Sequence, residues 1–253
     1  MLHLITRFFN LLLSYTQAAK QSAALCFGLL LPVSIQAATL PEFNATFAVD
    51  AFDIKLGTSS QTLRCVDQEC VLTATAKPSG LASLFIKETT EENIRLKQTD
   101  QQLTWQSYLK KTITRDSVKT VHFAKTQENP PQVHYVEKDR FWPLQNRLYD
   151  MVSIAYALQF YRLNQQPLTG FHLQDTGYQA ALDIKLVKPD DVLELADLKT
   201  KIDAEQYRFE TSKAKVKIWL LPRYDYFPGR IDVYNIESEK TITLLLEEPP
   251  KPL

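Results

Sequence analysis

The sequence predicts a mainly β protein: a curved antiparallel sheet or partial β-barrel with one central α-helix, after a cleaved signal peptide. Apolar residues recur at every second position along most of the chain, which is typical of half-buried antiparallel strands. Only one segment, about residues 145–161, has the apolar spacing of a convincing helix. About ten strands around a single helix do not fit a doubly wound α/β protein.

The N-terminus has the features of an export signal, and residues 1–37 contain no acidic side chain. An apolar run at residues 23–31 follows Lys20 and precedes the helix-breaking Pro32, and the segment ends in the small Ala37. The run is shorter than the roughly 20 apolar residues that a membrane-spanning helix needs. We therefore predict cleavage after Ala37. A membrane anchor that stays attached is the alternative.

Cleavage would leave residues 38–253, which we interpret as a single β-rich periplasmic domain. The whole chain carries 29 basic and 29 acidic residues. Loss of Arg7 and Lys20 with the signal makes the remaining chain slightly acidic. Nucleic-acid binding depends on a concentrated basic patch, so we expect no nucleic-acid partner.

Cys65 and Cys70 are the two cysteines that remain after cleavage. They flank a polar four-residue tip between two apolar arms, which predicts a hairpin. An oxidising periplasm permits a disulfide across it. A thioredoxin-like redox pair has two intervening residues rather than four, and a structural zinc site needs four ligands. We therefore predict a structural Cys65–Cys70 disulfide.

The remaining strands are predicted from alternation and turn residues. Residues 43–51 alternate, and the pattern changes register at Phe52 before it ends at Gly57. Residues 81–86 are apolar without alternation, which suggests a helical turn tucked under the sheet. The further predicted strands are residues 71–76, 88–98, 103–113, 118–125, 171–173, 178–187, 192–195, 199–209, 213–221, 227–236 and 241–246, with a turn at residues 189–191.

The helix is predicted from apolar residues at i, i+3, i+4 and i+7. Met151, Ala155 and Leu158 belong to this stripe, so a helix over about residues 145–161 should bury one long face. Pro143 suits its start.

Two segments resemble a known family. Residues 148–158, Leu-Tyr-Asp-Met-Val-Ser-Ile-Ala-Tyr-Ala-Leu, are similar to the helical signature of exported bacterial proteins in the domain of unknown function 3108 family. Residues 218–222 with 227–231 resemble that family's tryptophan strand, turn and following strand. The resemblance implies a β-rich periplasmic domain without an established activity. Residues 195–197 and 237–240 depart from the family's usual turns.

No catalytic constellation stands out, so we predict that the protein is not an enzyme and binds neither a cofactor nor a metal. The nucleophile elbow Gly-x-Ser-x-Gly of serine hydrolases is absent from the sequence. His122, His134 and His172 show no metal-ligand spacing. Asp150, or the pair Asp190 and Asp191, would be the candidates for an envelope hydrolase, the least favoured function.

Candidate binding residues gather near the helix start and at one aromatic hairpin. Tyr149, Asp150, Ser153 and Tyr156 could orient a ligand head group. Alternatively, Asp150 complements the helix dipole and Ser153 bonds a neighbouring strand. Trp219 either packs in the core or lines the mouth of an apolar pocket.

These observations favour a noncatalytic periplasmic protein. The concave face of its sheet would hold an apolar or amphiphilic ligand, such as a lipid, or an envelope protein. The alternative is a structural or interaction protein of envelope assembly with no small ligand. Membrane contact should be peripheral at most.

Overall fold

The computed structural model describes residues 38–51, 54–198 and 201–253. The predicted signal peptide, residues 1–37, lies outside the described residues. Among the helices that the structure describes, none is both long enough and apolar enough to cross a membrane.

The elements follow one another along the chain with mostly short connections. They are β1 (Phe43–Ala51), β2 (Ile54–Val66), β3 (Glu69–Pro78), the 3₁₀ turn η1 (Gly80–Leu84), β4 (Thr89–Gln98), β5 (Leu103–Ile113), β6 (Val118–Lys125), β7 (Gln132–Tyr135), η2 (Val136–Lys138), β8 (Arg140–Pro143), β9 (Leu148–Tyr149), the helix α2 (Ser153–Leu163), β10 (Phe171–Gln174), β11 (Gln179–Leu182), β12 (Lys185–Glu194), β13 (Lys201–Glu210), β14 (Ala214–Leu221), η3 (Pro222–Tyr224), β15 (Phe227–Asn235), β16 (Lys240–Leu246) and β17 (Lys251–Pro252).

The main sheet is antiparallel, and its strand order is β12-β13-β14-β15-β16-β1-β2-β3-β4-β5-β6-β7-β8, with β17 added to β1. The last long strand, β16, pairs with the first, so that Leu244 lies opposite Val49. The two ends of the β region therefore meet in the middle of the sheet, and β12 and β8 are its open edges. This architecture confirms the predicted mainly β class, with a curved, unclosed antiparallel sheet and, within the described part of the chain, one α-helix.

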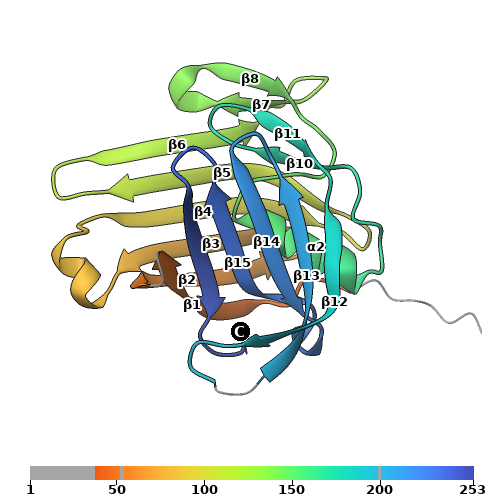
Figure 1. Cartoon of the computed structure of the whole chain (residues 1–253). Helices are drawn as coiled ribbons and strands as arrows, with labels where there is room; N and C mark the ends of the chain where they lie inside the picture. The colour runs from red at the N-terminus through yellow and green to blue at the C-terminus, as the bar shows by residue number, and fades with distance from the viewer. Residues whose placement is uncertain (1–37, 52–53, 199–200) are drawn as a thin grey trace, which may run out of the picture. The chain divides into compact units, whose positions relative to one another are not determined.

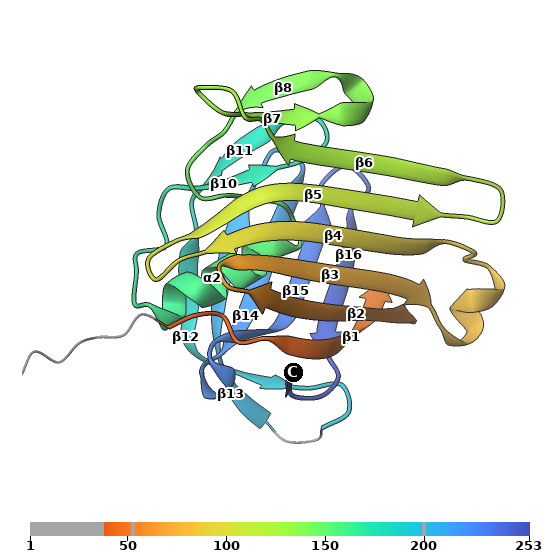
Figure 2. The same cartoon turned by 180° about the vertical axis from the view of Figure 1, so that it is seen from behind.

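The sheet curves so strongly that its two halves run in different directions. Figure 1 shows β13–β16 crossing the direction of β2–β6, and Figure 2 shows α2 on the concave side between the two halves. A smaller sheet of β9, β10 and β11 lies beside them, and in it β9 runs parallel to β10.

The helix is shorter and more deeply buried than its sequence pattern predicts. It begins at Ser153 rather than near residue 145, because Leu148 and Tyr149 form strand β9 and Asp150 caps the helix start. All residues from Ser153 to Tyr161 are buried. The expected single buried face is therefore wrong: both halves of the sheet pack on this helix, and its apolar stripe marks only part of its contacts.

Of three further local predictions on the strands, one falls outside the described residues and two are corrected. The expected register change at Phe52 lies outside the described residues, and the described Ala51 and Ile54 on either side of it pair with each other as the ends of antiparallel strands β1 and β2. The apolar segment at residues 81–86 is not tucked under the sheet, because Leu84, Phe85 and Ile86 are exposed. β12 continues through the expected turn at residues 189–191 with two register shifts. As an edge strand it tolerates Pro189 without losing a ladder bond.

Candidate functional site

Two rows of inward-facing side chains cross the β2–β6 half of the sheet. The first row is apolar and belongs to the core: Leu63, Leu72, Ile94, Tyr108 and Phe123. The next row lies two residues further along each strand: Gln61, Ala74, Glu92, Lys110 and Val121. The second row therefore places charged groups at positions that the alternation assigns to the interior.

The facing wall of the concave side is aliphatic. β1, β15 and β16 contribute Val49, Ile231, Val233, Ile242 and Leu244. These residues stand in register, because Leu244 pairs with both Val49 and Ile231, and Ile242 pairs with Val233. Ile242 is 46% exposed although it faces the concave side.

A cavity of ≈ 460 Å³ lies between the aliphatic wall and the second row. Its floor is formed by Asp150, Met151 and Val152 in the turn before α2 and by residues 173–176, which end β10 and follow it. Cavities that hold small ligands usually measure about 300–1,000 Å³ and are mostly apolar with a few polar groups. The size and the lining of this cavity both fall within that description.

Glu92, Tyr108 and Lys110 form a polar cluster on the cavity wall. The Tyr108 hydroxyl donates a hydrogen bond to Glu92 Oε1 at 2.7 Å, and Lys110 Nζ lies 3.5 Å from the same oxygen. Burial, with the nearby Glu92 charge, raises the pKa of Tyr108 far above its ordinary value, so its hydroxyl stays a donor. The side chain of Lys110 remains 37% exposed. Its ammonium is the more accessible charge of this pair.

Asp150 organises the start of α2. Its Oδ1 accepts the backbone N–H groups of Val152 and Ser153 at 3.0 and 2.9 Å, and its Oδ2 accepts Ser153 Oγ and Trp105 Nε1 at 2.7 and 3.1 Å. The Asp150 N–H donates back to Ser153 Oγ at 3.2 Å. This reciprocal pattern is that of a capping box. Ser153 thus bonds Asp150 rather than a neighbouring strand, and Trp105 of β5 makes the link to the sheet.

The environment of Asp150 has opposing effects on its charge. Burial raises the pKa of this carboxyl, while the hydrogen bonds from Ser153 and Val152 lower it, and the net direction is upward. Each carboxylate oxygen already accepts two hydrogen bonds from the protein. Asp150 therefore supports the cavity floor through backbone and side-chain donors, and its role in ligand binding stays a prediction.

Tyr149 and Tyr156 are buried on either side of this cap. The Tyr149 hydroxyl donates to the Leu103 carbonyl, and the Tyr156 hydroxyl donates to Gln61 Oε1 at 2.7 Å. Burial raises the pKa of both tyrosines well above the ordinary value. Tyr156 reaches the cavity only through Gln61, which belongs to the second row.

Trp219 is separated from the other four candidates. It lies between Ile218 and Leu220 on β14, is 7% exposed and belongs to the hydrophobic core, as the first alternative predicted. Its register, opposite Arg230, puts it on the other face of the sheet from the cavity residues Ile231 and Leu244. Its Nε1 donates to Asp191 Oδ2 at 2.9 Å, and the Arg230 guanidinium stacks 5.0 Å from its ring centre. The bond from Trp219 lowers the pKa of Asp191. The structure therefore brings together Tyr149, Asp150, Ser153 and Tyr156, but not Trp219.

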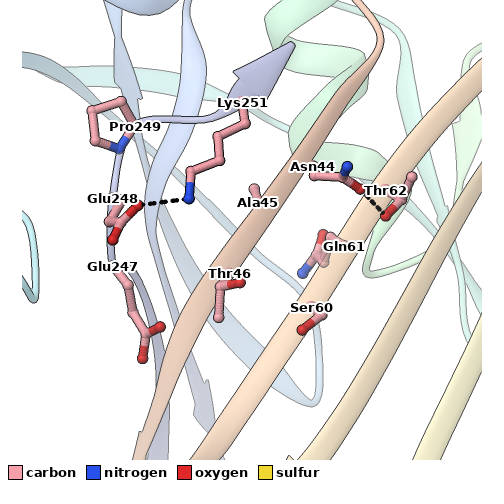
Figure 3. A pocket seen from close by; sticks show the side chains of 10 residues that line it. All are labelled: Asn44, Ala45, Thr46, Ser60, Gln61, Thr62, Glu247, Glu248, Pro249 and Lys251. Carbon is pink, nitrogen blue, oxygen red and sulfur yellow. Dashed lines mark hydrogen bonds and ion pairs between the residues drawn. The ribbon is translucent and has the colours of Figure 1, made fainter. Parts of the chain in front are cut away.

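Two other hollows have a different character. One of ≈ 370 Å³ lies between β1, β2 and the C-terminal segment, where Lys251 pairs with Glu248 at 3.0 Å and Thr62 bonds Asn44 (Figure 3). The other, of ≈ 960 Å³, lies near the β4–β5 turn beside Arg147. Arg147 is fully engaged there, since it bonds the carbonyls of Pro167 and Thr169. Polar residues dominate both hollows, so neither matches the apolar ligand that the sequence suggests.

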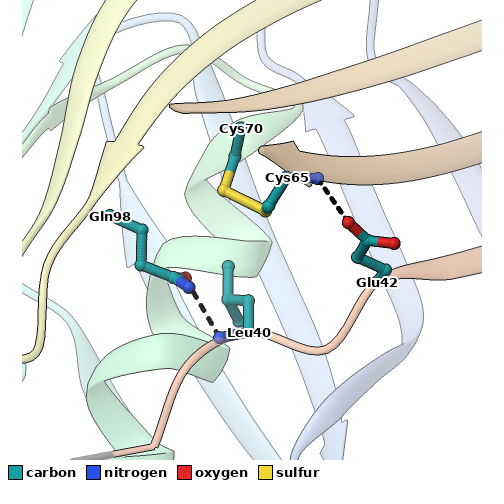
Figure 4. Close-up of a disulfide and its surroundings, with 5 residues drawn as sticks. All are labelled: Leu40, Glu42, Cys65, Cys70 and Gln98. Carbon is teal, nitrogen blue, oxygen red and sulfur yellow. Dashed lines mark hydrogen bonds between the residues drawn. A yellow bond between two sulfur atoms is a disulfide. The ribbon is translucent and has the colours of Figure 1, made fainter. Parts of the chain in front are cut away.

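The Cys65–Cys70 disulfide is confirmed (Figure 4). The two cysteines lie directly opposite each other, and the turn between β2 and β3 is tighter than the predicted four-residue tip, because Val66 pairs with Glu69. Two backbone contacts attach the preceding segment to this end of the sheet. Cys65 N–H donates to Glu42 Oε1 at 2.7 Å, and Leu40 N–H donates to Gln98 Oε1 at 3.0 Å.

Two of the histidines, His134 and His172, have local partners for their side chains. His134 Nε2 lies 3.1 Å from Asp139 Oδ1, and His172 Nδ1 lies 3.2 Å from the Asn146 carbonyl. Within residues 38–51, 54–198 and 201–253, no group of three or more His, Cys, Asp or Glu side chains could hold a metal ion.

Comparison with solved structures shows the fold. The chain is similar to a β-barrel-like protein of domain of unknown function DUF1849 from Brucella abortus, with a TM-score of 0.55 and 8% sequence identity over 85% of this chain and 99% of that chain. A DUF1089 family protein from Pseudomonas aeruginosa gives a TM-score of 0.30 at 10% identity, over 77% of this chain and 90% of that chain. No family model and no curated protein matches the sequence. Membership of the domain of unknown function 3108 family therefore stays a prediction.

Sequence reasoning missed the second row. Glu92 has the same strand parity as the buried Ile94 and Leu96. A charged residue at an inward position breaks the expected pattern unless it has a function. That signal was present on β4. On β5 the inward position of Lys110 could not be read from the sequence. The register shift opposite Arg95 and Leu96 places Trp105 and Lys110 on the same face of the sheet although they are an odd number of residues apart.

Proposed function

We propose that this is a noncatalytic periplasmic protein whose concave sheet face holds an apolar or amphiphilic molecule or part of an envelope partner. The observation that carries the proposal is the cavity of ≈ 460 Å³ between an aliphatic wall and a row with two charged groups. The cavity is open to solvent, so its aliphatic wall, including the 46% exposed Ile242, leaves apolar surface in contact with water. An apolar ligand that covers this wall would gain the free energy of burying that surface.

The two walls suggest how an amphiphile would lie. Its hydrocarbon part would cover Val233, Ile242 and Leu244, each CH₂ gaining about 0.8 kcal/mol on burial. Its polar group would meet Lys110 and Glu92 on the opposite wall. Glu92 already accepts a hydrogen bond from Tyr108 and forms an ion pair with Lys110, so an acceptor group on the ligand would pair with the more accessible Lys110 ammonium.

The disulfide supports the proposed compartment, because structural disulfides persist in oxidising environments such as the periplasm. The bonding of the acidic candidates supports a noncatalytic role. Asp150 is occupied by four donors, and Asp191 is bonded to Trp219.

Native mass spectrometry of protein purified from its own periplasm tests the ligand. We expect a bound mass in the parent and in Thr241→Trp, an exposed position next to the cavity residue on β16. Ile242→Trp should fill the cavity and lose that mass. Because Ile242 is half-exposed, the larger side chain should be accepted without overpacking the core.

An unliganded parent that also shows no thermal shift with lipids would contradict the ligand proposal and favour the structural alternative. Equal retention of the bound mass in Ile242→Trp would place the ligand elsewhere.

A further inference from the structure

Exposed apolar side chains surround one end of the sheet. Neighbouring strands are antiparallel, so the C-terminal ends of β1, β3 and β5 all lie at the same end of the sheet, opposite the Cys65–Cys70 hairpin. Figure 2 shows the η1 segment and the β5–β6 turn projecting there, away from α2. Leu84 is 63% exposed, Phe85 85% and Val118 58%. We call the following residues the apolar rim: Ile54, Leu84, Phe85, Ile86 and Val118.

The apolar rim is continuous with the cavity. Ala76 and Thr90 line the cavity as an opposed pair, and the η1 segment connects their two strands. Val118 lies opposite Ile113, three residues beyond the cavity residue Lys110. Ser79 N–H donates to the Leu56 carbonyl at 3.1 Å, which ties the η1 segment to the start of β2. A ligand leaving the cavity along the strands would therefore pass this rim.

Basic residues flank the apolar rim. The β3–β4 and β5–β6 connections and their adjoining strand ends carry Lys77, Lys87, Lys111, Arg115 and Lys119 as exposed cations, against the exposed acidic Glu88, Glu91 and Asp116. The opposite end of the sheet lacks this basic surrounding around its exposed apolar residue. There the exposed Val66 is preceded by Arg64 and followed by the acidic Asp67 and Glu69. Apolar side chains within a basic surrounding are typical of segments that bind the surface of anionic membranes.

We propose that the apolar rim docks onto the surface of an anionic lipid bilayer and so places the cavity mouth against the lipid. Because the flanking residues are mainly basic, they favour an anionic lipid surface over a neutral one. The proposal rests on the proposed function for its purpose, the exchange of an amphiphile with the membrane. The docking itself rests on the rim alone and can be measured without a ligand in the cavity.

Flotation of the purified mature chain with vesicles tests the docking. The parent should float with vesicles of phosphatidylethanolamine and phosphatidylglycerol and remain unbound with phosphatidylcholine alone. Leu84→Ser/Phe85→Ser should lower the bound fraction about tenfold or more, since two large apolar side chains leave the lipid. The control Val66→Ser, an equally exposed position at the other end, should bind like the parent.

A charge variant gives an independent measurement. Lys87→Gln/Arg115→Gln/Lys119→Gln should weaken vesicle binding and reduce its dependence on salt, because screening acts on the cations that remain. Arg64→Gln/Lys97→Gln, two exposed cations at the opposite end, should change neither quantity. This comparison decides the question if the rim variant loses its fold by circular dichroism.

Failure of the parent to bind the anionic vesicles overturns the proposal, and so does equal binding to phosphatidylcholine. The proposal is also overturned if the parent is a dimer that does not bind vesicles and a rim substitution makes it monomeric. In that case the apolar rim would be the interface with a second copy of the chain. Ile242→Trp should keep vesicle binding, and Leu84→Ser/Phe85→Ser should keep the bound ligand mass. Failure of the docking and failure of the ligand proposal are therefore separate results.

Discussion

At the scale of single residues, Asp150 shows how one buried carboxylate can specify a local structure. It ends strand β9, begins α2 and contacts β5 through Trp105. The helix dipole alone would account for an acidic group here, at about 0.3–1 kcal/mol. The structure adds four defined donors, and a buried polar group that loses its partner costs more than a dipole contact.

We therefore expect Asp150→Asn to lower the free energy of unfolding by about 1–3 kcal/mol, because an amide cannot accept bonds from both Ser153 Oγ and Trp105 Nε1 without leaving a donor unpaired. In a Trp105→Phe background the same substitution should cost less, since the indole donor is absent. Urea melts of the four proteins in a double-mutant cycle measure this coupling. If the effects of the two substitutions on the free energy of unfolding are strictly additive, the hydrogen bond between Trp105 and Asp150 contributes nothing to stability.

Asp150 should also affect the pH dependence of stability. Its pKa is raised in the folded protein, so the folded state binds this proton more tightly than the unfolded state does. The stability contributed by this group is then fully present below the unfolded pKa of about 3.9 and is lost as the pH rises through the folded value. The free energy of unfolding of the parent, relative to Asp150→Asn, should rise as the pH falls from about 7 to about 4. If urea melts show that the difference in free energy of unfolding between the two proteins does not change over this pH range, the raised pKa of Asp150 is contradicted.

At the scale of elements, burial explains why α2 is the centre of the core. The helix contacts both halves of the sheet through Tyr156, whose hydroxyl donates to Gln61 Oε1 of β2 at 2.7 Å and whose ring centre lies 5.8 Å from that of Phe227 on β15. Such a helix has no solvent face, so its stability depends on packing rather than on an amphipathic pattern.

Leu158→Ala should lower the free energy of unfolding by about 2–5 kcal/mol, because the fully buried leucine would leave a cavity. The matched substitution Leu163→Ala, at the half-buried end of α2, should cost clearly less. Both values come from urea melts. A Leu158→Ala protein that melts like the parent would show that α2 does not pack on the sheet in solution.

The β2–β3 hairpin depends on its disulfide to a limited extent. The closed loop is short, so removing the bond in Cys65→Ala/Cys70→Ala should cost an amount near the lower end of about 2–4 kcal/mol. Thiol labelling of native protein should modify neither cysteine. Labelling of both before any reducing agent is added would contradict the disulfide.

At the scale of the whole described unit, the pairing of β16 with β1 makes the sheet continuous. This pairing joins residues nearly two hundred positions apart along the chain, for example Phe47 and Leu246. Deleting β16 would create two long unpaired edges in the middle of the sheet rather than at its ends. The short β17, by contrast, pairs with β1 through Phe43 and Asn44 only.

We expect a chain that ends at residue 239 to lose cooperative folding, and a chain that ends at residue 248 to unfold like the parent within about 1 kcal/mol. Thermal melts followed by circular dichroism distinguish the two. Cooperative unfolding of the shorter chain would show that the β2–β8 half folds without closure of the sheet.

The sequence by itself determined the β class, several strands to the residue, the hairpin with its disulfide and the presence of one helix. Strands β5 and β6, for instance, have the predicted bounds, residues 103–113 and 118–125. These features depend on local alternation and on turn residues, which neighbouring positions reveal. The tertiary structure alone decided the start of α2, its burial on all sides and the position of Trp219 on the outer face. It also decided the cavity, because Glu92 and Lys110 acquire their facing aliphatic wall only when β15 and β16 return to pair beside β1. That pairing joins positions distant along the chain, and local periodicity carries no information about which strands will meet.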